Sequence, residues 1–207
     1  MKKLLIGLLA LGTFSFIACN SGSDKKGTEQ DMSNMKDTSK NTVDTNMQVT
    51  ELTPTFSNVD PKLAVSIKTV VDHYLHIKNA LVNDNGDEAA NGAKAMFNAL
   101  KAVDKSLLTA EQKKLYDGVE DDLKEHAEHI GDNAGKIEHQ REHFSMMSED
   151  AYDLVKAFGG GRTLYHDHCP MANDKKGGMW LSEMQQVKNP YFGGKMNECV
   201  KVMEVIK

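Results

Sequence analysis

Residues able to bind a metal ion are concentrated near the C-terminal end of the chain, between Tyr165 and Cys199. This stretch of the 207-residue chain holds two of the three cysteines, the single tryptophan and four methionines. Asn173 to Gly178 and Asn189-Pro190 are turn and loop sequences, which long helices do not contain. Thiolate, thioether and imidazole groups bind soft and borderline metals such as copper. The stretch therefore predicts a metal site or, alternatively, a small cap closed by a disulfide.

The candidate ligands of this stretch fall into two sets. Alternate side chains of a strand share one face, so His166 and His168 would point one way, and Cys169 and Met171 the other. A site would use the two histidines or would gather sulfur ligands from both ends of the stretch: Cys169, Met171, Met196 and Cys199. Imidazole suits copper(II) and zinc, and sulfur suits copper(I) and silver. A Cys169–Cys199 disulfide is the alternative in an oxidising compartment, and the sequence leaves both open.

Four further histidines form a second candidate metal site: His126, His129, His139 and His143. The first two lie near the end of one predicted helix and the last two near the start of the next. His139 and His143, four residues apart, share a helix face. His126 lies in an apolar stripe, where a buried imidazole needs a hydrogen bond or a metal ion. The simpler alternative is that His126 donates to Gln140 while the other three are solvated.

The chain lacks the catalytic signatures that would accompany such ligands in an enzyme. It contains no Glu-x-x-His pair of the kind that di-iron bundles use. It also contains no Gly-x-Ser-x-Gly, His-Glu-x-x-His or Walker sequence. We therefore predict a binding protein and not an enzyme.

The middle of the chain predicts the scaffold, a mainly α fold. Apolar residues at spacings of three and four recur in four successive segments between residues 60 and 161. Pro61 begins the first segment, a Thr109–Gln112 capping box opens the third, and Gly159 to Gly161 stops the fourth. Short connections favour an up-down-up-down four-helix bundle.

Residues 162–207 predict a small β-hairpin and loop cap that belongs to the same domain. Short strands are expected at 163–171 and 178–181, on either side of a turn, and a third at 200–206. We expect the cap at the end of the bundle where the fourth helix finishes. The second group of histidines would then lie at the opposite end, so the two groups would not form one site.

The first residues predict export. Two lysines precede an apolar run from Leu4 to Ile17 that is too short to span a bilayer, which is typical of a signal peptide over residues 1–18. Ala18-Cys19 resembles the cleavage site of bacterial lipoproteins, so we expect lipidation of Cys19 and attachment on the periplasmic side, with the outer membrane favoured. Residues 19–59 carry few apolar side chains and predict a disordered tether. A net charge of −5 argues against nucleic acid as a partner.

Two parts of the sequence carry a family resemblance. The helical part contributes Tyr74, Lys78 to Leu81, Gln140-Arg141, Phe144 and Ser148. The C-terminal part contributes Tyr165, Cys169-Pro170-Met171-Ala172, Gly177, Trp180-Leu181-Ser182, Asn189-Pro190-Tyr191-Phe192-Gly193, Met196 and Cys199. Together, from about Asp60 to Lys207, they resemble the domain-of-unknown-function 3347 family. Val200 departs from the glycine usual in the family after the second cysteine.

The resemblance implies an exported role around transition metals. The family is similar to a domain at the C-terminus of some periplasmic adaptors of copper and silver efflux pumps, and it also occurs in stand-alone lipoproteins. We therefore expect a tethered protein that binds copper, or else zinc or silver, and sequesters it or passes it to an efflux adaptor or another envelope protein. The alternative is a metal-free interaction module that docks through exposed Trp180, Tyr191 and Phe192.

Overall fold

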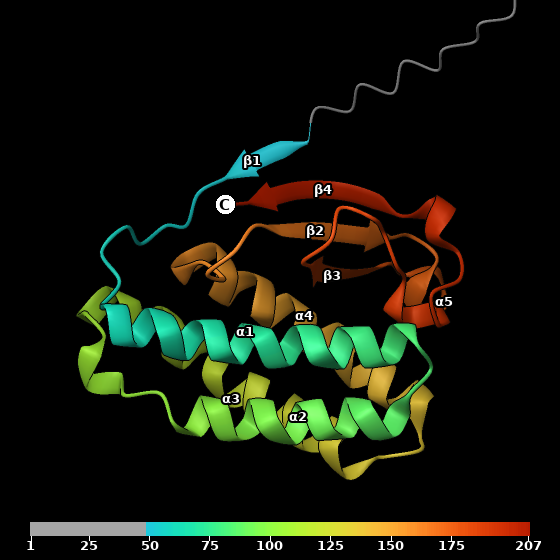
Figure 1. Ribbon diagram of the computed structural model, residues 1–207, viewed down its shortest axis with the longest axis horizontal. Coiled ribbons are helices and arrows are strands. Elements are labelled where there is room, and N and C mark those ends of the chain that lie inside the picture. The colour runs from blue at the N-terminus through green and yellow to red at the C-terminus, as the bar shows by residue number, and fades with distance from the viewer. Residues whose placement is uncertain (1–48) are drawn as a thin grey trace, which may run out of the picture. The chain divides into compact units, whose positions relative to one another are not determined.

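Four long helices form the body of the structure, a computed structural model that describes residues 49–207 (Figure 1). The predicted signal peptide, Cys19 and most of the predicted tether lie outside the described residues. The helices run over Pro61–Val82 (α1), Gly86–Lys101 (α2), Ala110–Asp132 (α3) and Ile137–Phe158 (α4). Each helix packs against the next, and α4 also contacts α1. The predicted four-helix bundle is confirmed.

Local sequence signals set the helix boundaries. The Asp60 side chain accepts hydrogen bonds from the backbone at Lys62 and Leu63, with Pro61 in the first turn. Thr109 and Gln112 make both bonds of the predicted capping box. At the end of α4, Gly159 adopts a φ of 81°, a conformation that glycine accepts readily. The short segments between and after the long helices are η1 (Lys105–Leu107), α5 (Ala172–Lys175), η2 (Pro190–Phe192) and η3 (Asn197–Cys199).

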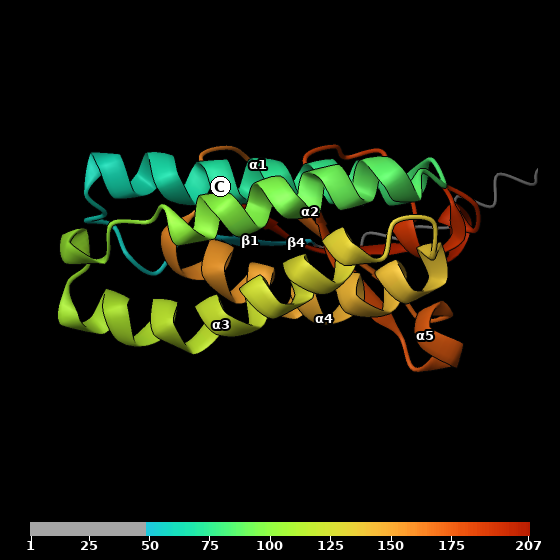
Figure 2. The same cartoon turned by 90° about the horizontal axis from the view of Figure 1, so that it is seen from below.

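A four-stranded sheet covers one side of the bundle (Figures 1 and 2). Its order is β1-β4-β2-β3, where β2 pairs antiparallel with both β3 and β4 and β1 pairs parallel with β4. The strands are β1 (Thr50–Leu52), β2 (Leu164–Cys169), β3 (Gly178–Ser182) and β4 (Lys201–Ile206). The three predicted C-terminal strands are present. The fourth, β1, comes from the segment predicted as tether.

The predicted disordered tether is wrong for its last residues. Leu52 accepts a hydrogen bond from the Lys207 backbone at 3.0 Å, and Phe56 donates one to Ala157 at 2.9 Å. The Phe56 ring lies 5.2 Å from that of Phe158. These contacts are non-local, so a composition that predicts disorder does not reveal them.

The cap lies along the side of the bundle and not beyond the end of α4. The Leu181 backbone donates to the Tyr74 hydroxyl at 3.0 Å, and the Tyr152 hydroxyl donates to Glu204 at 2.6 Å. The loop between β3 and β4 reaches the α1–α2 turn, because the Arg141 side chain donates to both Pro190 and Leu81 backbone oxygens. The expectation that the cap and the second histidine group occupy opposite ends is therefore wrong.

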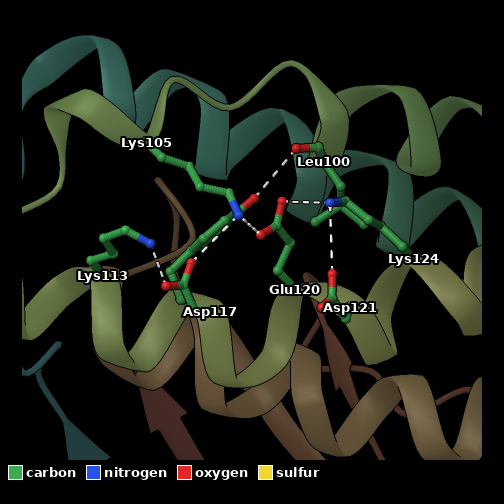
Figure 3. A network of polar contacts seen from close by, with 8 residues as sticks. Leu100, Lys105, Lys113, Asp117, Glu120, Asp121 and Lys124 are labelled. Carbon is green, nitrogen blue, oxygen red and sulfur yellow. Dashed lines mark hydrogen bonds and ion pairs between the residues drawn. The ribbon is translucent and has the colours of Figure 1, made fainter.

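A charged network ties η1 to α3 on the outer side of the bundle (Figure 3). The nearly buried Glu120 carboxylate binds Lys105 on one side and Lys124, at 2.6 Å, on the other. Asp117 extends the network by pairing with Lys105 and Lys113. In the described part of the chain, no helix combines the length and the apolar character needed to cross a bilayer.

Candidate metal centre

Three histidines gather at the surface where α3 meets α4. His129 comes from the last turn of α3, and His139 and His143 come from the first two turns of α4. One nitrogen of each ring lies within 4.8 Å of the other two. Two nitrogens bound to one metal at about 2.0–2.1 Å can lie at most about 4.2 Å apart. The nitrogens must therefore move closer together before all three can bind one ion.

The rings are already in contact. The His129 and His143 rings stack at 4.2 Å and 4° between their planes, and the His139 ring meets His143 edge-on at 4.7 Å. His126 approaches from the inner side, with its Nδ1 3.2 Å from Nδ1 of His143. Parallel rings cannot both point a nitrogen at one ion, so either His129 or His143 must turn. All three rings are only half-buried, which leaves room for that movement.

The surroundings keep two of the rings neutral. Burial, followed by the neighbouring His129, His139 and His126, lowers the pKa of His143 to about 4. Burial also lowers the pKa of His126. A metal binds the neutral imidazole, so a low pKa reduces competition from protons at neutral pH.

Two carboxylates flank the histidines. Glu142 lies 3.2 Å from Nδ1 of His139, and Glu125 lies 4.0 Å from Nε2 of His129. Carboxylates in such positions orient a metal-binding imidazole and increase its basicity. The sequence analysis missed both residues, although spacings of three and four on a helix predict these contacts.

The expected hydrogen bond from His126 to Gln140 does not form. The Gln140 amide instead donates to the backbone oxygens of Gly86 at 2.8 Å and Ile130 at 3.1 Å, which ties the α3–α4 turn to α2. A Cβ atom at Gly86 would lie 2.7 Å from the Gln140 oxygen, so a side chain there would displace the Gln140 amide. His126 is thus left to face His143.

The two cysteines of the cap touch without bonding. The sulfurs of Cys169 and Cys199 lie 3.7 Å apart; Cys169 is fully buried and Cys199 is partly exposed. The Cys199 thiol also lies 3.1 Å from the Met196 backbone oxygen. Both remain free thiols in this structure, so the proximity is compatible with either a disulfide or a shared ion.

The two cap histidines have separate environments. His166 lies 3.0 Å from Glu204 and packs on the Tyr152 ring. His168 lies beside Gly177, where an added Cβ would come within 2.9 Å of its Nε2. Strand β2 pairs with β3 without interruption, so His166 and His168 share one face and Cys169 lies on the other, as the alternation predicted. The register shift between β2 and β4 skips Met203 of β4. Over residues 49–207, the only group of three or more His, Cys, Asp or Glu ligands close enough to share an ion is the one at His129, His139 and His143.

The aromatic residues expected to form a docking face lie mostly inside. Trp180 is fully buried and Tyr191 is 6% exposed, and Phe192 is partly buried. The Tyr191 hydroxyl donates to the Met179 backbone at 2.7 Å. The prediction that these three aromatic residues are exposed is therefore wrong. They join the cap to the bundle core, so the alternative of an interaction module loses the surface that was proposed for it.

The fold and the site define a class: a helical bundle with a side sheet and a histidine cluster between two helices. Residues 70–163 match the family model described as "Protein of unknown function (DUF3347)", so this region of the chain belongs to that family. The match begins within α1 and ends before β2, so it contains all four histidines of the second candidate site and leaves out the cap residues of the sequence motif. Comparison with curated proteins and with solved structures finds no match.

Proposed function

We propose that this protein binds a borderline divalent transition metal ion, with copper favoured, through His129, His139 and His143. The observation that carries the proposal is that one nitrogen from each of these three rings lies within 4.8 Å of the others. Imidazole ligands suit copper(II) and zinc. Three protein ligands leave a coordination position open, which suits a protein that takes up and releases the ion.

The predicted cellular role rests on the sequence. Cys19 and the apolar run before it support lipid anchoring at the periplasmic side of a membrane, and the family resemblance supports copper as the ion. We propose that the protein sequesters the ion or passes it to an efflux adaptor. Hand-over requires an accessible site, and the half-buried histidines meet that condition.

The test is a metal titration of the full-length protein with copper(II) and zinc. We expect a dissociation constant tighter than about micromolar, which corresponds to about −8 kcal/mol. His139→Gln and His129→Gln should each weaken binding at least about tenfold, or about 1.4 kcal/mol.

The matched control is His168→Gln, which removes a cap histidine outside the cluster. It should leave the affinity unchanged. If His168→Gln weakens binding while the cluster variants do not, the site belongs in the cap. Absence of binding tighter than micromolar would refute the proposal altogether.

A further inference from the structure

A second concave site lies between α4 and the loops of the cap. We call it the thioether pocket, because the side chains of Met171 and Met196 both line it. It has a volume of about 420 Å³. The other lining residues are Glu138, Arg141, Glu142, Asn173, Asp174, Lys175, Tyr191 and Phe192.

Backbone strain is concentrated around this pocket. Five non-glycine residues between 49 and 207 have a positive φ, and four of them, Asn173, Asp174, Lys175 and Met196, line the pocket. The fifth, Asp84, lines the adjoining hollow that shares Arg141 and Met196. Left-handed backbone is unfavourable for residues such as lysine and methionine. Strain of this kind tends to cluster at functional sites.

Hydrogen bonds hold the first strained loop against α4. The Asn173 amide donates to Ser145 at 2.7 Å and to the Gly177 backbone at 3.0 Å. Ser145 lies on α4 one turn beyond Glu142, so this loop is fixed to the helix that forms the pocket wall. Met171, which precedes the loop, is therefore presented from a defined position.

The second strained loop is held in the same way. The Asn197 side chain accepts from the Asn189 backbone at 2.9 Å and donates to the Gly194 backbone at 2.8 Å. The Arg141 Nε donates to Pro190 at 2.9 Å and anchors the loop to α4. Met196 is thus kept at a φ of 53° beside the pocket and is 36% exposed.

The chemistry of the pocket favours a soft cation. Met171 is 37% exposed, so both thioethers are accessible to an ion in solution. Thioethers are neutral, soft ligands that select copper(I) and similar ions. The carboxylates of Glu138 and Glu142 on α4 and of Asp174 on the cap loop line the pocket and offset the positive charge of an ion and of Lys175, which also lines it. The Arg141 guanidinium is already engaged with backbone oxygens and with Asp84 and Glu138.

The thioether pocket adjoins the histidine cluster through one residue. Glu142 lines the pocket and also contacts His139 at 3.2 Å. The two sites therefore lie on neighbouring faces of the first turns of α4 and offer ligands of different softness.

We propose that Met171 and Met196 together bind a soft monovalent cation, copper(I) or silver(I), in the thioether pocket. This site is separate from the divalent site at the histidines and does not require it. No electron transfer is involved, because the ion enters in its monovalent state.

The experiment follows the methionine methyl groups of the full-length protein by NMR, with ¹³C-methyl methionine and silver(I) as the redox-inert probe. Signals of Met171 and Met196 are assigned from Met171→Leu and Met196→Leu variants. We expect these two signals to shift together and to saturate near stoichiometric addition. Because the Cys199 thiol lies 3.1 Å from the Met196 backbone oxygen, the titration is run in a Cys199→Ser background, in which silver held by the cysteine pair cannot move the Met196 signal.

The decisive variant is Met171→Leu, in which the Met196 signal should no longer shift, since one ion needs both ligands. Met146 and Met203, which are 44% and 45% exposed, are the matched controls and should remain unshifted. Met146→Leu should leave the Met171 and Met196 shifts intact. Parallel movement of all four exposed methionines, or an unchanged Met196 shift in Met171→Leu, would overturn the proposal.

A cross-check separates this site from the divalent site. His139→Gln should leave the silver(I) shifts unchanged, and zinc should leave both methionine signals in place. If the wild-type protein binds neither zinc nor copper(II) but shows the silver shifts, the proposed function is refuted and this inference stands. Divalent binding by the wild-type protein without the silver shifts would refute only this inference.

Discussion

Asp167 and Lys78 are charged residues that are fully buried between the sheet and the bundle. Lys78 pairs with Glu183 at 2.8 Å, and Asn79 donates to the same carboxylate. Burial raises the pKa of Asp167 to about 7, although the Lys78 charge and Trp180 act in the opposite direction. Burial also lowers the pKa of Lys78. The interior of the cap thus contains an acid that titrates near neutral pH.

This shift predicts a pH-dependent stability. The folded state holds the Asp167 proton up to about pH 7, whereas the unfolded chain releases it near the ordinary aspartate pKa of 3.8. The resulting stabilisation is fully present below the unfolded pKa and is lost as the pH rises through the folded pKa. Between pH 5 and 8 we expect a loss of about 3 kcal/mol, since the two units from pH 5 to the folded pKa correspond to about 1.4 kcal/mol each. Asp167→Asn should remove this part of the pH dependence.

Urea unfolding of both proteins at pH 5 and pH 8 measures the effect. The quantity compared is the difference in unfolding free energy between wild type and Asp167→Asn, which cancels the other titrating groups. If that difference is the same at the two pH values, Asp167 does not titrate between them.

Helix α3 depends on its charged network as well as on its apolar face. Glu120 is 3% exposed and holds Lys105 and Lys124 in place (Figure 3). Removing a buried carboxylate leaves its partners without compensation, although Lys105 is exposed enough to regain water. We expect Glu120→Ala to lower the free energy of unfolding by about 2 kcal/mol.

The neighbouring Asp121 provides the control. It is 91% exposed, so Asp121→Ala should change the free energy of unfolding by less than about 0.5 kcal/mol. Equal effects of the two substitutions, measured in urea, would contradict the role assigned to Glu120.

The close contact between α1 and α2 reverses the stability effect that is expected when a glycine within a helix is replaced with alanine. From helix propensity alone, replacing Gly92 with alanine should stabilise α2 by about 1 kcal/mol. In the structure, an added Cβ would lie 3.1 Å from Ile77 and 3.2 Å from His76. Ile77 is fully buried in the core and cannot move aside easily. We therefore expect Gly92→Ala to destabilise the protein by about 1 kcal/mol.

Gly118 on α3 provides the control, because an added Cβ there meets no atom within 4 Å. Gly118→Ala should stabilise the protein, as helix propensity predicts, and raise the midpoint of thermal unfolding, whereas Gly92→Ala should lower that midpoint. A stabilising effect at both positions would mean that the helices can separate slightly at Ile77.

The elements that could be predicted from the sequence are those with local signals. The spacing of apolar residues and the helix-capping residues predicted all four helices, because these signals lie within the segment that forms each helix. Strand β1 is three residues long and pairs in parallel with β4, about 150 positions away in sequence, so no local pattern predicts it. The bulge in β4, where the pairing with β2 skips Met203, likewise depends on the partner strand.

In the candidate site too, the features with local sequence signals could be predicted and those that depend on distant contacts could not. The sequence predicted that His139 and His143 share a face and that His126 and His129 lie opposite, because both inferences depend on helix geometry. It did not predict that the cap loops reach the same end of the bundle, since that placement depends on Arg141 and its distant backbone partners.

At the scale of the whole molecule, the sheet and the bundle share one core. Leu164, Trp180, Leu181 and Ile206 of the sheet belong to the same buried cluster as the bundle residues. Tyr74 of α1 connects the two, because its hydroxyl contacts both Ser148 on α4 and the Leu181 backbone on β3. A domain with a single core should unfold in one cooperative step.

Trp180 allows this cooperativity to be tested, because it is the chain's one tryptophan and lies fully buried in the cap. Its fluorescence reports on the sheet, and far-ultraviolet circular dichroism reports on the helices. We expect the two signals to follow a single transition in urea with the same midpoint, and Tyr74→Phe to shift both midpoints together. This substitution removes only the hydroxyl that joins α1 to α4 and β3, at a cost of about 1–2 kcal/mol. If the fluorescence transition came first, the cap would be a separate unit, and a site built from α4 and the cap loops would open before the bundle unfolds.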